Sequence, residues 1–245
     1  MYVDRKMSGP QCCENPPVLS SVSGLGSVDY VGGLKSYVSG SSSSKLAVVL
    51  ISDIFGYEAP KLRNIADKIA KAGFYVVVPD FLKGDPYDPT NAARALPVWI
   101  KDHGTDKGFE DAKIVIADLK SKGIESIGAA GFCWGAKVVV ELSNYPYIQA
   151  AVLLHPSFVS VEDIEGVKVP ISVLGAENDQ MSPVELVNKF GEVLKAKQEV
   201  PYLIKIFPGV SHGWSVKYDD NNPKAVESAE ESHQDLIDWV VKYIK

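Results

Sequence analysis

The chain has 245 residues, of which 46% are hydrophobic and 23% are charged, and its formal net charge is −6 at pH 7. This is the composition of a globular protein large enough to close a core without disulfides or metal ions. Nucleic acid and membranes are disfavoured as partners, because there is no dense Lys/Arg cluster and no apolar run near the ~20 residues of a membrane span.

The predicted elements alternate between strand and helix after the N-terminal residues. Two short strands flank Gly32-Gly33 within 27–40, the pattern of a β-hairpin. Apolar, β-branched runs predict buried strands, and apolar residues three and four apart predict helices. In chain order we then expect a strand at 46–52, a helix at 60–73, a strand at 74–80, helices at 91–101 and 109–123, a strand at 126–131, a helix at 134–145, strands at 148–155 and 170–179, a helix at 183–197, a strand at 202–209 and a helix at 224–244.

This alternation predicts an α/β fold, with a mainly parallel central sheet and helices on both faces. We expect a single domain over residues 1–245, including an N-terminal extension of about 25 residues. Ligands of such sheets bind beyond the carboxyl ends of the strands. The polar residues expected at these ends are Asp53, Asp80, Cys133, His155, Asp179 and His212.

Cys133 stands in Gly131-Phe132-Cys133-Trp134-Gly135, which has the outline of G-x-S-x-G with cysteine in place of serine. A strand is expected before it and a helix after it, which is the setting of a nucleophile elbow. The start of a helix favours a thiolate, and its free N–H groups can hold an oxyanion. A buried structural cysteine between two glycines is the alternative interpretation.

Asp179 and His212 follow two later strands. A carboxylate at Asp179 could orient an imidazole, although an Asp before Ser-Pro often caps a helix, and Glu177 is a nearby rival. His212 lies in a glycine-flanked loop and is expected to be accessible, whereas His233 on the last helix is expected to be solvated. The order Cys133, Asp179, His212 is the chain order of the α/β-hydrolase triad.

Five segments of the chain resemble the dienelactone hydrolase (carboxymethylenebutenolidase) family of α/β-hydrolases. They are SDIFGYE (52–58), VVVPDFLKGDP (77–86), GAAGFCWGAK (128–137), GAENDQMSP (175–183) and FPGVSHGW (207–214). The N-terminal GPQCCENPP is similar to the eukaryotic, plant-like branch of this family. The resemblance implies the α/β-hydrolase fold and a Cys-Asp-His triad at Cys133, Asp179 and His212.

The resemblance also implies an oxyanion hole made by the backbone N–H groups of Ile54 and Trp134. Family members often carry a Glu next to the resting thiol, and here that position is Asp53, which is one methylene shorter. Bacterial members hold a substrate carboxylate with arginines, but Arg5, Arg63 and Arg94 all lie outside the matching segments. The substrate-binding residues are therefore expected to be Asp53, Phe55, Phe81, Lys83, His155 and Trp214, with Trp134 and Phe158 also at an aromatic rim.

These observations predict a cysteine-dependent hydrolase of small esters or lactones that works through a thioester and needs no cofactor or metal. A ligand-binding protein on a hydrolase fold is one alternative. A glucan hydrolase is another, because some plant relatives are so named, and Asp53 and Asp80 would then supply its two carboxylates.

The three cysteines, Cys12, Cys13 and Cys133, bear on the compartment. Their odd number and the absence of an apolar signal core near the N-terminus predict reduced thiols in the cytoplasm. Cys12 and Cys13 are expected to form an exposed pair without a chemical role, and a redox role is the alternative. The expected partner is a small-molecule ester or lactone, and the protein is expected to be a monomer or homodimer.

Overall fold

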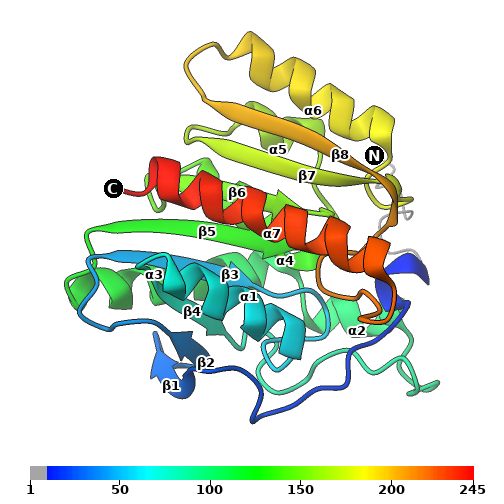
Figure 1. The fold of residues 1–245 in the computed structure, drawn as a ribbon, viewed down its shortest axis with the longest axis horizontal. Coiled ribbons are helices and arrows are strands. Elements are labelled where there is room, and N and C mark those ends of the chain that lie inside the picture. Colours follow the sequence, from blue (N-terminus) through cyan, green and yellow to red (C-terminus); the bar gives the residue numbers. More distant parts are fainter. Residues whose placement is uncertain (1–9) are drawn as a thin grey trace.

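The computed structural model describes residues 10–245, which form an eight-stranded sheet in the order β1-β2-β4-β3-β5-β6-β7-β8 (Figure 1). The pairs β1–β2 and β2–β4 are antiparallel, and all the others are parallel. The strands are β1 (Ser27–Val31), β2 (Leu34–Ser39), β3 (Leu46–Ile51), β4 (Tyr75–Pro79), β5 (Ser126–Phe132), β6 (Ala150–Leu154), β7 (Ile171–Asn178) and β8 (Tyr202–Ser211).

Helices cover both faces of the sheet. One face carries α1 and α7, which lie in front of it in Figure 1, and their apolar side chains share a core cluster with β3 and β4. The other face packs against α3, α4 and α6. The α-helices are α1 (Pro60–Lys71), α2 (Leu96–Asp102), α3 (Thr105–Ser121), α4 (Trp134–Ser143), α5 (Val161–Glu165), α6 (Val184–Ala196) and α7 (Pro223–Tyr243), and a short 3-10 helix, η1, spans Pro10–Cys13.

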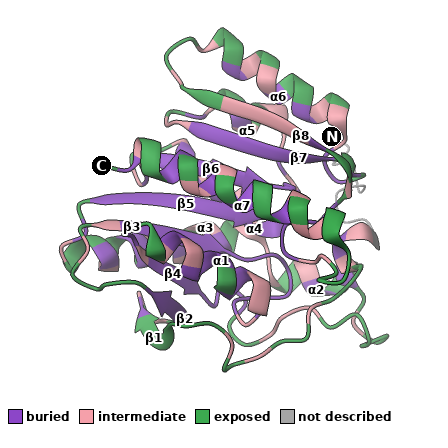
Figure 2. Ribbon diagram, viewed as in Figure 1, coloured by how far each residue is buried: buried purple, intermediate pink, exposed green. Residues whose placement is uncertain are grey.

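The predicted mainly parallel sheet with helices on both faces is confirmed. The central strands are buried along their length, whereas the outward faces of α6 and α7 are exposed (Figure 2). No helix in the described range is both long and apolar enough to cross a membrane.

Two helix boundaries differ from the sequence prediction. Helix α2 begins only at Leu96, because Pro97 takes one of its first positions, where a residue without an N–H is tolerated. Helix α3 begins at Thr105, four residues before the predicted start, and therefore contains Gly108. A Cβ at Gly108 would lie 2.5 Å from the Trp134 ring, so that ring occupies the space beside the helix.

The connection from β5 to α4 is compact because two glycines allow close backbone approach. A Cβ at Gly131 would lie 2.3 Å from the carbonyl oxygen of Gly135, and a Cβ at Gly135 would lie 2.2 Å from that of Ile51. Real Cβ atoms do not come this near to backbone atoms. Helix α4 can therefore start directly against the ends of β3 and β5.

The segment after η1 runs along α1 and is tied to it by buried polar groups. The Arg63 side chain donates to the carbonyl oxygens of Ser21 and Ser23, and Asp67 accepts from the backbone N–H of Leu25. These bonds hold the segment between η1 and β1 against α1. Its start, η1, lies at the carboxyl ends of the strands (Figure 1).

We predict that Gly135→Ala destabilises the fold by about 1–3 kcal/mol, the usual cost of overpacking. The added methyl group would press on the backbone of β3, which cannot move without disturbing the sheet. Chemical denaturation at equilibrium measures the loss. Gly191→Ala in α6 is the matched control, because its Cβ would meet only the Ile204 side chain at 3.3 Å. Equal free energies of unfolding for Gly135→Ala and the wild type would contradict the close approach.

Candidate active site

Cys133 lies at the turn between β5 and α4, with φ 52° and ψ −108°. A non-glycine residue at positive φ is strained, and such strain is often found at functional sites. The backbone of Cys133 is held on both sides, because its N–H donates to Leu154 at 3.1 Å and its carbonyl accepts from Ser157 N at 3.1 Å. The side chain is only 3% exposed, and its Sγ lies 3.3 Å from the Ser157 hydroxyl.

The structure brings His212 and Asp179 together beside this sulfur. His212 directly follows β8, and its Nδ1 donates to Asp179 Oδ2 at 2.8 Å. Asp179 is in turn fixed by backbone N–H groups, from Met181 at 2.7 Å and from Ser182 at 3.2 Å. With Nδ1 carrying the proton toward the carboxylate, His212 Nε2 is directed into the site.

Burial and neighbouring charges shift the pKa values of these groups. Burial raises the pKa of Cys133 well above its ordinary value, so the thiol is protonated at neutral pH. Burial lowers the pKa of His212, but the negative charge that Cys133 carries when ionised and the hydrogen bond to Asp179 favour the imidazolium and raise the pKa to about 9.

Cys12, at the end of η1, also lies in this site. Its Sγ lies 3.5 Å from Cys133 Sγ, 3.7 Å from His212 Nε2 and 3.8 Å from Ser157 Oγ. The predicted exposed pair is therefore wrong for Cys12, which is 3% exposed, while Cys13 is partly buried. Sequence reasoning could not find this contact, because 121 residues separate the two cysteines.

The hydrogen bond with Cys133 lowers the pKa of Cys12, against the opposing effect of burial. Cys12 is therefore the easier of the two thiols to ionise, and Cys133 is the one that keeps its proton. Among the described residues, one group of three side chains has metal-binding atoms within 4.8 Å of one another, namely Cys12, Cys133 and His212.

Polar contacts hold η1 over the site. The Gln11 side chain donates to Asn178 O at 3.1 Å and accepts from Gln180 N at 2.7 Å. From the other side, Lys217 Nζ donates to the carbonyl oxygens of Gln11 at 3.4 Å and Cys12 at 3.0 Å. These bonds connect η1 to the loops that carry Asp179 and His212.

The backbone N–H groups of Ile54 and Trp134, expected to form an oxyanion hole, donate to no acceptor in the part of the chain that the structure describes. Asp53, which precedes Ile54, is buried, and its carboxylate accepts from Phe55 N at 3.0 Å. Burial raises the pKa of Asp53, against the nearby Lys217 charge. The Asp53 carboxylate therefore accepts a hydrogen bond within its own loop rather than contacting the Cys133 thiol.

The other expected substrate-binding residues fall into three groups. Phe55, Phe81 and Trp214 are buried, and Lys217 lies over the Phe55 ring at 5.4 Å. His155 is fully buried behind His212, with the two rings edge to face at 5.1 Å. Lys83 is bound to Asp111 at 2.9 Å and lines a different pocket from that of His212.

The positions of the Trp134 and His233 rings differ from those predicted from the sequence. The Trp134 side chain is no rim residue, because it is buried and its indole N–H donates to His103 O at 2.9 Å. His233 is buried rather than solvated, and its Nε2 contacts Ser215 O at 2.7 Å. Burial lowers its pKa to about 4, so at neutral pH the ring is uncharged and donates this hydrogen bond. It thus anchors the loop after His212 to α7.

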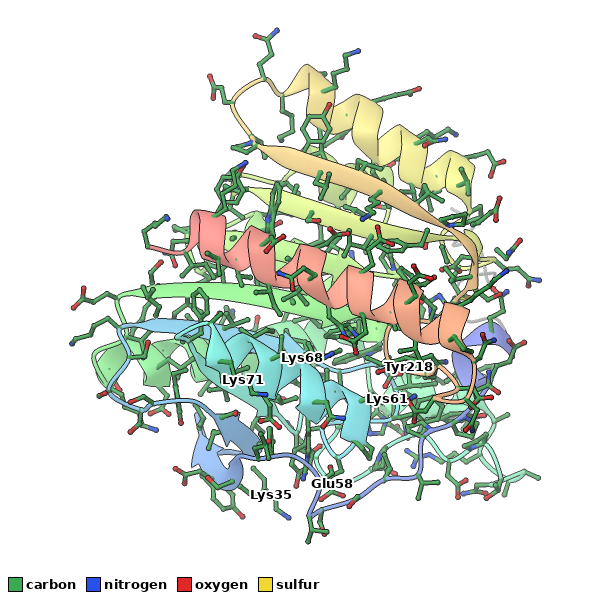
Figure 3. The ribbon with its side chains drawn as sticks, viewed as in Figure 1. Lys35, Glu58, Lys61, Lys68, Lys71 and Tyr218 are labelled. Carbon is green, nitrogen blue, oxygen red and sulfur yellow. The ribbon has the colours of Figure 1, made fainter. Side chains whose placement is uncertain are left out.

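A pocket of about 610 Å³ opens beside His212. Its lining includes Trp214, Lys217 and Tyr218 of the loop after β8 and Glu14 of the segment after η1. Figure 3 shows Tyr218 beside Lys61 of α1, whose Nζ lies 3.3 Å from the centre of the tyrosine ring. This contact fixes the outer wall of the pocket to α1.

We predict that Gln11→Ala accelerates alkylation of Cys133 by iodoacetamide. The substitution removes both side-chain bonds of η1 to the loop of Asp179, so the segment leaves the thiol more often. Peptide mass spectrometry over time measures the modification at each cysteine. Gln234→Ala is the matched control, because its amide contacts only Asp238 on the exposed side of α7. An unchanged rate at Cys133 in Gln11→Ala would show that η1 does not restrict access.

Comparison with known proteins gives a consistent result. The sequence model of the dienelactone hydrolase family matches residues 34–244. A Homo sapiens protein named carboxymethylenebutenolidase homolog is 34% identical over 226 residues, which cover 90% of this chain and 92% of the human protein. The family resemblance seen in the sequence motifs is thus confirmed.

A Zea mays protein named endo-1,3;1,4-beta-D-glucanase is 46% identical over 198 residues, or 78% of this chain. The match spans 64% of the maize protein, so the chain covers less than two thirds of that relative. Among solved structures, a putative dienelactone hydrolase from Klebsiella pneumoniae has a TM-score of 0.70 at 20% identity, covering 86% of this chain and 93% of the other. That likeness supports the fold.

Proposed function

Because the chain belongs to the dienelactone hydrolase family, we propose that it is a cysteine-dependent hydrolase of small esters or lactones. The family and its carboxymethylenebutenolidase homologues make the chain a hydrolase. The nucleophile, the triad and the substrate class are the proposal. The observation that carries it is the buried His212–Asp179 hydrogen bond beside a cysteine at a strained strand-to-helix turn.

The proposed reaction begins with transfer of the Cys133 thiol proton to His212 Nε2. The sulfur then attacks the carbonyl carbon of the ester, and the oxyanion that forms accepts hydrogen bonds from Ile54 N–H and Trp134 N–H. Each such donor is worth roughly 3–4 kcal/mol in the transition state. Asp179 keeps the imidazole in the tautomer that accepts at Nε2 and stabilises the imidazolium.

The alcohol and then the carboxylic acid are released in two steps, and the protons balance in each. The C–O bond breaks as the leaving alkoxide takes the proton from His212, which leaves a thioester on Cys133. A water molecule gives a proton to His212 and attacks the thioester carbonyl. The C–S bond breaks, the thiolate recovers that proton, and the carboxylic acid leaves. No step requires a cofactor.

The substrate must replace the side chain of Cys12, whose sulfur now fills the space beside Cys133 and His212. Displacement of η1 would also release Lys217, which holds two of its carbonyl oxygens. A lysine in this place can pair with a substrate carboxylate, although without the planar two-point contact of an arginine. We therefore favour small esters or lactones, including those with an acidic group. The need for free thiols favours a reducing compartment such as the cytoplasm.

Glucan hydrolysis and ligand binding without turnover remain the competing functions. The name of the maize relative motivates the first. Glycosidases usually act through two carboxylates that flank the bond, and cysteine has no part in that reaction. Both alternatives therefore predict that the chemistry of Cys133 is dispensable.

We predict that the wild type hydrolyses p-nitrophenyl acetate and members of a small ester and lactone panel. Cys133→Ala should lower kcat/KM by about 10³-fold or more, because loss of a nucleophile removes the acyl-enzyme route. Circular dichroism and thermal melting check that the variant is folded. Turnover of β-glucan that survives in Cys133→Ala, measured as reducing-sugar release, would instead support the glucanase. Equal inactivity of both proteins toward all esters would support ligand binding.

We predict that kcat/KM rises from neutral pH toward about 9. The His212 pKa is raised to about 9, so the imidazolium persists through neutral pH and the base form appears only as pH increases. Asp179→Asn should move this rise to lower pH and reduce the rate by up to about 10⁴-fold, since the carboxylate both favours the imidazolium and holds the tautomer. Stopped-flow assays corrected for spontaneous hydrolysis give the profile. A rate that is flat or falls over this range would contradict His212 as the base.

A further inference from the structure

We propose that Cys12, Cys133 and His212 form a Zn²⁺ site that the N-terminal segment assembles over the nucleophile. Two of its ligands belong to the proposed triad, and the third is brought by η1. The three side chains are buried, and their ligand atoms all lie within 4.8 Å of one another. Thiolate and imidazole are the donors that structural and catalytic Zn²⁺ sites use.

Two of the three distances between the ligand atoms match those of a Zn²⁺ site, and the third, from Cys133 Sγ to His212 Nε2, lies within 4.8 Å. Zn–S bonds of about 2.3 Å and Zn–N bonds of about 2.0–2.1 Å at tetrahedral angles place the donor atoms roughly 3.5–3.8 Å apart. Here the two sulfurs are 3.5 Å apart, and Cys12 Sγ is 3.7 Å from His212 Nε2. A disulfide between the same sulfurs would need a separation of about 2.05 Å and an oxidant. The observed spacing is that of two reduced thiols in contact, and it also suits two ligands of one ion.

The surroundings of His212 are those of a metal ligand. Histidines that bind zinc usually give their other ring N–H to a carboxylate, which fixes the tautomer and makes the free nitrogen more basic. His212 Nδ1 donates to Asp179 Oδ2 at 2.8 Å, so Nε2 is the nitrogen left to bind. Asp179 is itself held by two backbone N–H groups, those of Met181 and Ser182.

The charges at the site are compatible with a divalent cation. Binding releases the thiol protons of Cys12 and Cys133, and the two thiolates then neutralise the ion. Among the described residues, Lys217 is a cation beside Cys12, and its Nζ donates to the carbonyl oxygens of Gln11 and Cys12. Three protein ligands leave a fourth position for water, with the Ser157 hydroxyl near both sulfurs.

The ion would have two effects, of which only the second rests on the proposed function. It would hold η1 on the loops of Asp179 and His212, because Cys12 becomes a ligand. It would also stop hydrolysis, since the same ion occupies the sulfur that attacks and the nitrogen that takes the proton. The N-terminal segment would thus make the enzyme sensitive to zinc.

The test uses the full-length chain, freed of metal and kept reduced with a phosphine. Zn²⁺ binding is measured by equilibrium dialysis against a competing chelator, and Co²⁺ is used as a spectroscopic probe of the ligands. We expect one equivalent of Zn²⁺, and for Co²⁺ a thiolate-to-metal charge-transfer band with the visible bands of tetrahedral coordination. Cys12→Ser should weaken Zn²⁺ binding roughly 100-fold or more, because a strong ligand is lost. Cys13→Ser, the neighbouring thiol, is the matched control and should bind as the wild type does.

A second variant keeps the test decisive if Cys12→Ser is poorly folded. Gln11→Ala leaves all three ligands in place and loosens η1, so it should weaken Zn²⁺ binding by about 10-fold. Equal Zn²⁺ affinity in the wild type, Cys12→Ser and Gln11→Ala would overturn the proposal, as would octahedral Co²⁺ without a charge-transfer band. Dialysis requires no turnover, so zinc binding in a protein that hydrolyses no ester would refute the proposed function and leave the metal site standing.

Discussion

The close approach of α4 to the ends of β3 and β5 is the constraint on which the site depends. It exists because Gly131 and Gly135 have no side chains where the backbone of the neighbouring elements passes. The chain between them must turn sharply, and Cys133 takes positive φ at that turn. The sulfur is thereby placed at the end of the sheet, next to the start of a helix, where His212 and Asp179 arrive from β8 and β7. A single Cβ at either glycine would disturb the whole arrangement.

The N-terminal segment adds a second constraint, which acts on chemistry rather than on folding. Cys12 reaches the pair Cys133–His212 because Gln11 and Lys217 hold η1 from two sides. The contact divides the protons unequally, since the pKa of Cys12 is lowered and that of Cys133 is raised. The sulfur of the proposed nucleophile is therefore protonated at neutral pH and covered by Cys12. The proposed catalysis and the proposed metal binding would use the same atoms, so they would exclude each other.

The central architecture could be predicted from sequence because it rests on local patterns. Runs such as LAVVLI and YVVVP have no polar face, so only a strand covered on both sides accommodates them. The polar residues at the strand ends were also identifiable, since parallel strands bring their carboxyl ends to one edge. The predicted boundaries of α3 and α2 were wrong near Gly108 and Pro97. Gly108 lies inside α3, where the Trp134 ring packs beside it, and Pro97 takes one of the first positions of α2, where proline is tolerated. The buried His233 was missed because its partner, Ser215, is 18 residues away and lies in a loop.

The sequence by itself determined the strand-and-helix alternation, the glycines around Cys133 and the order in which Cys133, Asp179 and His212 follow their strands. These are properties of neighbouring residues, and local sterics and periodicity are enough to establish them. Only the tertiary structure decided three contacts. Cys12 lies against Cys133, the Trp134 indole donates to His103 O, and Lys217 donates to the carbonyl oxygens of η1. Such contacts join residues far apart in the chain, and no local pattern encodes which distant partner a cysteine or a lysine will meet once the sheet has brought the loops together.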